Sequence, residues 1–246
     1  MPGGKGPGGR GKSGGAGIGP SGGQRQARQR LQSKKQRTQS SRQWLERQLN
    51  DPYVAAARRE GYRSRAAYKL AEIDDRFHVL KPGRSVVDLG SAPGGWSQVA
   101  AERVRAVDGK GQVVAIDILP MEPVTGVDAI QLDFMDDSAP ARLKAMLASG
   151  RAHVVLSDMA AQGTGHARTD HLRIIGLAEA ALQFAAEVLE PGGAFVCKVL
   201  QGGTERELLE ALKRDFAAVR HVKPPASRAE SAEMYVVATG FRGAGP

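Results

Sequence analysis

One stretch constrains the fold of this chain more than any other: residues 86–97, Val-Val-Asp-Leu-Gly-Ser-Ala-Pro-Gly-Gly-Trp-Ser. A short apolar run leads into a turn rich in Gly and Pro, and residues 98–103 then favour a helix. Strand, loop and helix in this order predict the first unit of a nucleotide-binding α/β fold, with glycines where the backbone turns tightly and approaches a ligand. The free N–H groups at the start of the helix favour a negatively charged group on that ligand.

The second apolar run indicates which ligand this is. Residues 112–116 end at Asp117, roughly 20 residues beyond the loop, where nucleotide folds place an acid that binds ribose. The loop has neither a Walker lysine nor a complete Gly-x-Gly-x-x-Gly pattern, so it is poorly suited to phosphates. A glycine loop followed by such an acid, without phosphate chemistry, indicates S-adenosylmethionine as the cofactor.

Positive charge is concentrated at the start of the chain. Residues 1–45 hold ten of the 35 Lys and Arg and no acid, so the rest of the chain carries 25 basic against 26 acidic residues. We expect residues 1–40 to be a disordered extension, because a segment so rich in Gly, Arg and Gln cannot bury enough apolar surface to fold. A basic flexible arm binds phosphates without sequence preference, and we favour this role over that of a solubilising tail.

Composition limits the remaining possibilities. Residues 41–246 are sufficient for one α/β domain. No apolar run approaches the roughly 18–20 residues that cross a bilayer, and the N-terminus lacks the apolar region of a secretory signal. Cys197 stands alone and the five His are scattered, so we expect neither an internal disulfide nor a metal site. These features predict a cytoplasmic protein without membrane contact, and a monomer is the default expectation.

Beyond residue 84 the pattern alternates between strands and helices, which predicts a doubly wound α/β fold. The expected strands are 85–89, 112–117, 128–132, 153–157 and 193–199, and the expected helices lie near 95–107, 138–149, 170–189 and 203–214. Two further apolar runs, 216–222 and 234–239, are too close for a helix between them and predict a terminal antiparallel pair. A seven-stranded, mostly parallel sheet with a terminal antiparallel strand is the architecture of the Rossmann-like class I S-adenosylmethionine-dependent methyltransferases. Ahead of it, residues 64–77 predict an amphipathic helix with Ser64 as its cap.

Ligands of open α/β sheets bind at the carboxyl ends of the strands, and polar residues lie at these points. They are Asp88, Asp117, Asp133, Asp158 and Lys198. Lys198 interrupts an apolar run, and a buried ammonium is costly unless it is paired or neutral. One interpretation is a lysine on an edge strand whose amine reaches solvent. We favour the other, a neutral lysine that acts as a general base, because a Gln-Gly-Gly loop follows it.

Three more residues have both a structural and a functional interpretation. Trp96 follows the glycine loop and belongs either to the core or to the cofactor pocket, with nothing in the sequence to decide. Asp133 is placed to meet the adenine amino group, and we favour this over a solvent-facing acid. Asp88 is expected to brace the glycine loop by hydrogen bonds rather than to take part in the reaction.

Taken together, the motifs resemble the FtsJ/RrmJ family of ribosomal RNA 2′-O-ribose methyltransferases, from about residue 41 to residue 241. The matching segments are Tyr-Arg-Ser-Arg-Ala-Ala-Tyr-Lys-Leu (62–70), Asp-Leu-Gly-Ser-Ala-Pro-Gly-Gly-Trp-Ser-Gln (88–98), Asp-Ile-Leu-Pro-Met (117–121), Leu-Ser-Asp-Met-Ala (156–160), Val-Cys-Lys-Val-Leu-Gln-Gly (196–202), Lys-Pro-Pro-Ala-Ser-Arg (223–228) and Ser-Ala-Glu-Met-Tyr (231–235). Several motifs in the same order are far more specific than one glycine loop. The loop after Asp158 departs from the family pattern, since Ala-Gln stands where Pro-Asn is expected.

The resemblance implies roles for particular residues. The family has a tetrad of Lys, Asp, Lys and Glu. The resemblance implies that its members here are Lys69, Asp158, Lys198 and Glu233, so all four are present. Its cofactor positions correspond to Gly94, Trp96, Asp117, Asp133 and Asp158. RNA is expected on the basic residues Arg58, Arg59, Arg63 and Arg65, and near Lys223 and Arg228.

The implied activity is methyl transfer from S-adenosylmethionine to the ribose 2′-hydroxyl of a uridine in large-subunit (23S) ribosomal RNA, in the assembled 50S subunit. A tRNA 2′-O-methyltransferase is a close alternative, because related enzymes share the tetrad. A non-catalytic RNA-binding ribosome-assembly factor is the alternative from another class, and loss of a tetrad residue would favour it. A small-molecule methyltransferase fits poorly with the Arg-rich segment and the basic extension.

Overall fold

The structure is a computed structural model that describes residues 45–46, 48–161, 165–201 and 206–243. The extension expected to be disordered, residues 1–40, lies outside the described residues, as does Thr204 at the start of the predicted fourth helix of the alternating pattern.

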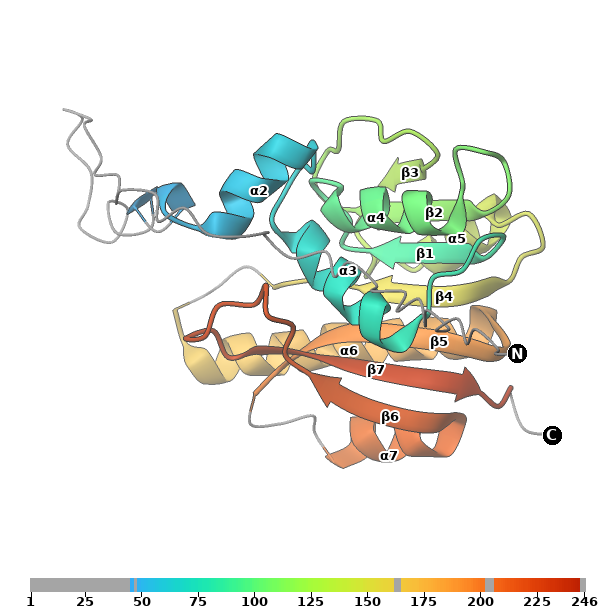
Figure 1. The fold of residues 1–246 in the computed structure, drawn as a ribbon. Helices are drawn as coiled ribbons and strands as arrows, with labels where there is room; N and C mark the ends of the chain where they lie inside the picture. Colours follow the sequence, from blue (N-terminus) through green and yellow to red (C-terminus); the bar gives the residue numbers. More distant parts are fainter. Residues whose placement is uncertain (1–44, 47, 162–164, 202–205, 244–246) are drawn as a thin grey trace, which may run out of the picture.

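A single seven-stranded sheet organises the molecule (Figure 1). Its strands are Ser85–Leu89 (β1), Gln112–Asp117 (β2), Asp128–Gln131 (β3), Ala152–Ser157 (β4), Leu189–Leu200 (β5), Phe216–Val222 (β6) and Glu233–Phe241 (β7), in the order β3-β2-β1-β4-β5-β7-β6. The first five are parallel, and β7 is antiparallel to both of its neighbours. The predicted methyltransferase architecture is therefore confirmed, with β7 inserted between β5 and β6.

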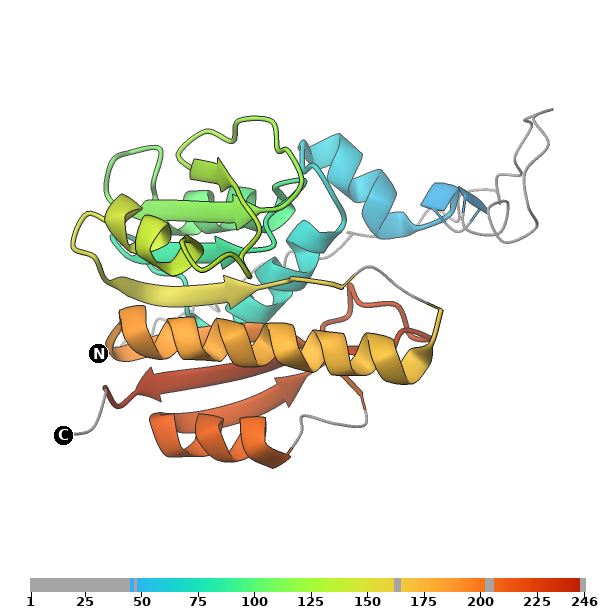
Figure 2. The ribbon, with the colours of Figure 1, turned by 180° about the vertical axis from the view of Figure 1, so that it is seen from behind.

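Helices cover both faces of the sheet. They are Pro52–Glu60 (α2), Ala66–Phe77 (α3), Gly95–Val104 (α4), Ala139–Met146 (α5), Ala167–Val188 (α6) and Arg206–Asp215 (α7). Helices α3 and α4 lie on the face seen in Figure 1, whereas α5, α6 and α7 lie on the face seen in Figure 2. Neighbouring strand residues such as Val86 and Val87 point into opposite cores, and both are buried. Burial on both faces explains why these strands read as continuous apolar runs rather than alternating ones.

Several predicted boundaries differ from the structure by one to four residues, among them those of the helices predicted at 138–149 and 170–189, and three differences have a clear cause. Ser64 does not cap α3, because the N-cap residue is Arg65 and no side-chain cap bond is made. The predicted first helix of the alternating pattern ends at Val104 instead of 107, since Arg105 adopts a left-handed conformation that closes it. Strand β5 begins at Leu189 instead of 193, and its register against β4 shifts near Gly192, where a positive φ lets the chain continue from helix to strand.

Candidate active site

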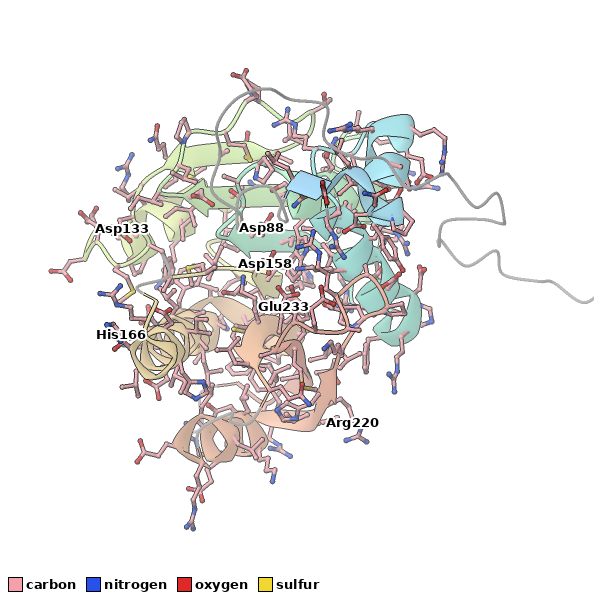
Figure 3. The ribbon with its side chains drawn as sticks, turned by 90° about the vertical axis from the view of Figure 1, so that its left-hand side faces the viewer. Asp88, Asp133, Asp158, His166, Arg220 and Glu233 are labelled. Atoms are coloured by element: carbon pink, nitrogen blue, oxygen red, sulfur yellow. The ribbon has the colours of Figure 1, made fainter. Side chains whose placement is uncertain are left out.

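The carboxyl ends of the parallel strands meet at one edge of the sheet, and Figure 3 looks onto this edge. Asp88, Asp158 and Glu233 lie near its centre, and Asp133 lies to one side of them. The sheet order explains this arrangement, because β1, which carries Asp88, pairs with β4, which leads into Asp158. The site is therefore assembled where the sequence predicts it.

The glycine loop between β1 and α4 is shaped by close contacts. Gly90 has φ +78°, and a Cβ there would lie 2.8 Å from Cα of Met159, so the loop can pass this close to the segment after β4 only without a side chain. Gly94 is the N-cap of α4 and also has a positive φ. Asp88 braces the loop as predicted, because its Oδ2 accepts a hydrogen bond of 2.6 Å from Ser97 Oγ on α4.

Two of the three acids expected at the cofactor pocket, Asp117 and Asp133, also shape their own loops. Asp117 accepts hydrogen bonds of 2.8 Å from the main-chain N–H groups of Ala92 and Leu119, which ties the glycine loop to the end of β2. Asp133 Oδ1 accepts from the N–H of Met135 at 2.9 Å, and the residue is exposed.

The groups at this edge fit S-adenosylmethionine. Exposed apolar side chains lie within two residues after Asp117 and Asp133, namely Ile118, Leu119 and Met135, which suits a planar adenine beside carboxylates that accept from its amino group and the ribose. In the described part of the chain, Asp88 Oδ1 and Ser91 Oγ are buried beside the loop without a hydrogen-bond partner. Unpaired buried polar atoms are rare in proteins, so these two mark a place for polar groups of a ligand or for water.

Trp96 belongs to the core. Its side chain is 2% exposed, and its Nε1 donates a hydrogen bond of 2.9 Å to the main-chain oxygen of Ala66 on α3. The indole ring packs against Tyr235 of β7, with 5.5 Å between ring centroids. Contact between Trp96 and a cofactor would therefore come from its main chain at the start of α4.

Four charged side chains from distant parts of the sequence, one of them Asp158, meet at this edge of the sheet. Lys198 Nζ on β5 donates to Asp158 Oδ1 at 3.1 Å and to the main-chain oxygen of Asp158 at 2.6 Å. Lys69 Nζ on α3 lies 2.6 Å from Glu233 Oε1 at the start of β7. The structure thus brings together all four residues of the tetrad, as two ion pairs.

Lys198 is not an edge-strand lysine. Strand β5 lies between β4 and β7, and the side chain of Lys198 is only 10% exposed. That interpretation is therefore wrong, and the cost of burying this amine is offset by its two bonds to Asp158.

Tyr235 also belongs to the site, although no pattern in the sequence singled it out. It is fully buried, and its hydroxyl lies 2.9 Å from Asp158 Oδ1 and 3.1 Å from Glu233 Oε1. Strand periodicity could have found it, because residues two apart on a strand share a face, and Tyr235 follows Glu233 by two. Its register partner on β5 is Lys198.

Charge and burial shift the pKa of Glu233 in opposite directions. Burial by itself raises the pKa of this carboxyl, but the ammonium of Lys69, and then that of Lys198 and the hydroxyl of Ser227, bring the pKa below its usual value. Burial and the neighbouring carboxylates Asp158 and Glu233 raise the pKa of Tyr235 well above its usual value. The site therefore contains an ionised Glu233 and a protonated phenol.

The loop between β6 and β7 is fastened to the helices before β1. Arg65 and Arg228 both bind the carboxylate of Asp51, and Arg65 also donates to the main-chain oxygen of Ala226. The N–H of Ala226 donates to Glu72 at 2.7 Å. The next residue, Ser227, donates from Oγ to Glu233 Oε1 at 3.0 Å, so this fastening determines where Glu233 is held.

Most of the basic residues expected to contact RNA hold acceptors of the protein itself. Arg63 donates to the main-chain oxygens of Glu122 and Pro123, and Lys223 donates to those of Ala229 and Ser231. Arg58 and Arg59 of α2 are exposed, and Arg59 pairs with Glu60. The RNA contacts themselves stay predictions.

The described residues include neither a membrane-spanning helix nor a metal-binding cluster. None of their helices combines the length and the apolar character that a membrane span requires. No cluster of three or more His, Cys, Asp or Glu among them could hold a metal ion.

Comparison with known proteins decides the family, because the profile of the FtsJ-like methyltransferases matches residues 62–241. The chain belongs to the FtsJ-like methyltransferase family. This FtsJ-like methyltransferase is 63% identical over 214 residues to the ribosomal RNA large subunit methyltransferase E of Azorhizobium caulinodans, covering 87% of this chain and 89% of the relative. It is 66% identical over 204 residues to the protein of the same name from Nitrobacter hamburgensis, covering 83% and 89%.

A solved structure supports the same assignment. A ribosomal RNA methyltransferase from Plasmodium falciparum superposes on the chain with a TM-score of 0.66 and 33% identity, covering 74% of this chain and 100% of that one. The family implies S-adenosylmethionine as the methyl donor, in agreement with the groups at the carboxyl edge.

Asp88 generates a prediction about stability. Burial raises the pKa of its carboxyl to about 7, against the hydrogen bond from Ser97 and with a further contribution from the carboxylates of Asp158 and Asp117. The folded protein therefore holds this proton more tightly than the unfolded chain, in which Asp titrates near about 4. The free energy of unfolding is then expected to fall as pH rises from about 4 to about 7.

We expect Asp88→Asn to remove this contribution, because the amide oxygen still accepts from Ser97 but carries no charge. Thermal melts across this pH range check it, with Asp137→Asn at an exposed carboxyl as the matched control. Equal pH slopes of Tm in Asp88→Asn and the wild type would contradict the prediction.

Proposed function

We propose that this FtsJ-like methyltransferase transfers a methyl group from S-adenosylmethionine to the ribose 2′-hydroxyl of a uridine in 23S ribosomal RNA, within the assembled large subunit. The names of its relatives support the large subunit as the substrate. The observation that carries the chemistry is the Lys198 amine, buried at the carboxyl edge of the sheet and held by both the side chain and the main chain of Asp158.

A ribose hydroxyl is a poor nucleophile near neutral pH, so the protein has to align it and remove its proton. When bound, S-adenosylmethionine supplies a methyl group already activated by its sulfonium. Lys198 in its neutral form accepts the proton of the 2′-hydroxyl, and Asp158 keeps its amine in place. Lys69 and Glu233, paired with each other, help to orient the hydroxyl and to stabilise charge.

Alignment is the larger of the two contributions. Holding reacting groups in line can supply roughly 7–11 kcal/mol, whereas a positioned base adds on the order of 10²–10⁴-fold in rate. Rigid placement of the tetrad is therefore expected to matter more than the basicity of one amine. The buried ion pairs and the bound loop between β6 and β7 provide that rigidity.

Two alternatives make different demands on the site. A tRNA 2′-O-methyltransferase would use the same tetrad with other RNA contacts. A non-catalytic assembly factor would have no need of four ionisable side chains packed together away from solvent, since burying unused charge destabilises a fold. The intact pairs therefore favour an enzyme over a binding protein.

We also infer that the protein works as a monomer in the cytoplasm. All four tetrad residues come from one chain, so the site needs no second copy. Ribosomal RNA as substrate places the activity where ribosomes are assembled.

Mapping of 2′-O-methyl groups in a deletion strain tests the substrate. We expect one uridine of 23S rRNA to lose its methyl group and to regain it on complementation with the wild type but not with a Lys198→Ala variant. Purified 50S subunits and protein-free 23S rRNA from the deletion strain are then compared as substrates in vitro. Loss of methylation in tRNA instead, or no change in any RNA, contradicts the proposal.

Lys198→Ala tests the base. We expect methylation to be abolished, while the affinity for S-adenosylmethionine stays within a few-fold, because Asp158, the expected cofactor position that Lys198 binds, is also held by its own N–H on the main-chain oxygen of Leu89. Single-turnover assays and calorimetric titration of the cofactor separate the two effects. Lys144→Ala, at an exposed lysine on α5, is the matched control. Near-wild-type turnover in Lys198→Ala would remove this residue from the mechanism.

Deletion of residues 1–40 tests the basic extension. The segment carries nine Lys and Arg and no acid, so we expect its removal to raise KM for RNA and to flatten the dependence of KM on salt, with little change in kcat. Steady-state assays at several salt concentrations measure both slopes. An unchanged salt slope would mean that the extension does not hold RNA.

A further inference from the structure

Tyr235 occupies the point where the two ion pairs of the site meet. Its hydroxyl lies 2.9 Å from Asp158 Oδ1, which binds Lys198, and 3.1 Å from Glu233 Oε1, which binds Lys69. Lys69 Nζ is also 3.3 Å from the same hydroxyl. Among the described residues, the charged groups that form hydrogen bonds with this oxygen, Asp158, Glu233 and Lys69, all belong to the tetrad.

Donor counting shows what this oxygen can do. A phenol has one O–H to donate, and an ionised carboxylate can only accept, so the proton serves Asp158 or Glu233 but not both at once. The lysine ammonium of Lys69 donates to the phenol oxygen from the other side. Burial and the two carboxylates keep the phenol protonated, since they raise its pKa well above the usual value.

Packing holds the ring of Tyr235 in place, so its hydroxyl can change direction only by rotation about the C–O bond. Tyr235 is fully buried between strands β5 and β6, opposite Lys198 in the register of β5. Its ring packs on Trp96, whose indole is itself bonded to Ala66 of α3. Turning the O–H between two carboxylates therefore requires no movement of heavy atoms.

We propose that Tyr235 is a positioning residue that couples the Lys198–Asp158 pair to the Lys69–Glu233 pair, an inference that rests on the proposed function. While Lys198 is neutral, the phenol donates to Asp158 and stabilises a carboxylate that lacks a full counter-charge. When Lys198 takes the proton of the ribose hydroxyl, Asp158 pairs with the new ammonium and the O–H turns to Glu233. The phenol keeps its proton throughout, and only its hydrogen bond changes partner.

Tyr235→Phe tests the coupling, because it retains the ring and removes one oxygen. Hydrogen bonds to charged groups contribute about 1.5–3 kcal/mol, so we expect kcat to fall about 10- to 100-fold. KM for S-adenosylmethionine and for RNA should stay within a few-fold. Without the O–H, the Asp158 carboxylate loses the hydrogen bond that competes with Lys198 for it, so the acidic limb of the kcat–pH profile is expected to move to higher pH.

Tyr68→Phe is the matched control. Tyr68 is as deeply buried as Tyr235, and its hydroxyl donates to a carboxylate, that of Glu60, outside the tetrad. This variant loses the same chemical group as Tyr235→Phe, but at a place outside the tetrad. We therefore expect its pH profile to coincide with that of the wild type. Thermal melts of both variants establish that each is folded under assay conditions.

Replacement of Tyr235 by 3-fluorotyrosine gives a second test that preserves the hydroxyl. A stronger donor stabilises Asp158 further, so the acidic limb should move to lower pH, opposite to Tyr235→Phe. If the acidic limb of the kcat–pH profile moves neither in Tyr235→Phe nor in the 3-fluorotyrosine protein, the proposal is overturned, even if kcat falls. A merely structural role of Tyr235 would lower activity without moving that limb. If the wild type itself does not methylate 23S rRNA, the proposed function fails instead, which the same assay reveals.

Discussion

The structure depends on the burial of two lysine amines at the end of an apolar sheet. An ammonium taken out of water costs several kcal/mol unless a counter-charge and hydrogen bonds replace its hydration. Lys198 obtains both from a single residue, Asp158, whose side chain and main chain accept from the same amine. Lys69 obtains its counter-charge from Glu233. Each lysine therefore fixes one carboxylate, and the positions of strands β4, β5 and β7 follow from these requirements as well as from their apolar pairing.

The same constraint links the helices before the sheet to the active site. Asp51 binds Arg65 and Arg228 together, and Glu72 holds the main chain of Ala226. These contacts fasten the loop between β6 and β7, which carries Ser227 to Glu233. Basic residues that a linear reading assigns to RNA thus serve first to position the carboxylate of Glu233. Any RNA contact by Arg65 or Arg228 has to share the guanidinium with Asp51.

Local sequence accounted for much of the fold, and the resemblance to the family implied the tetrad. The apolar runs predicted the strands within a few residues, because both faces of the sheet are covered and the strands must be apolar throughout. The motifs identified Lys69, Asp158, Lys198 and Glu233, and the structure brings them together. Ser64 was wrong as a helix cap, since a short polar residue before a helix is a common signal but its side chain is here buried without a bond.

The sequence by itself determined which residues carry charge and at which strand ends they lie. Only the tertiary structure decided how they pair, because pairing depends on sheet order: β7 enters between β5 and β6 and so places Tyr235 beside Lys198. The same packing resolved Trp96 as a core residue and excluded an edge-strand position for Lys198. The physical reason is that hydrogen bonds and ion pairs act over a few ångströms in space, whereas Lys69 and Tyr235, which meet in the site, are 166 positions apart in sequence.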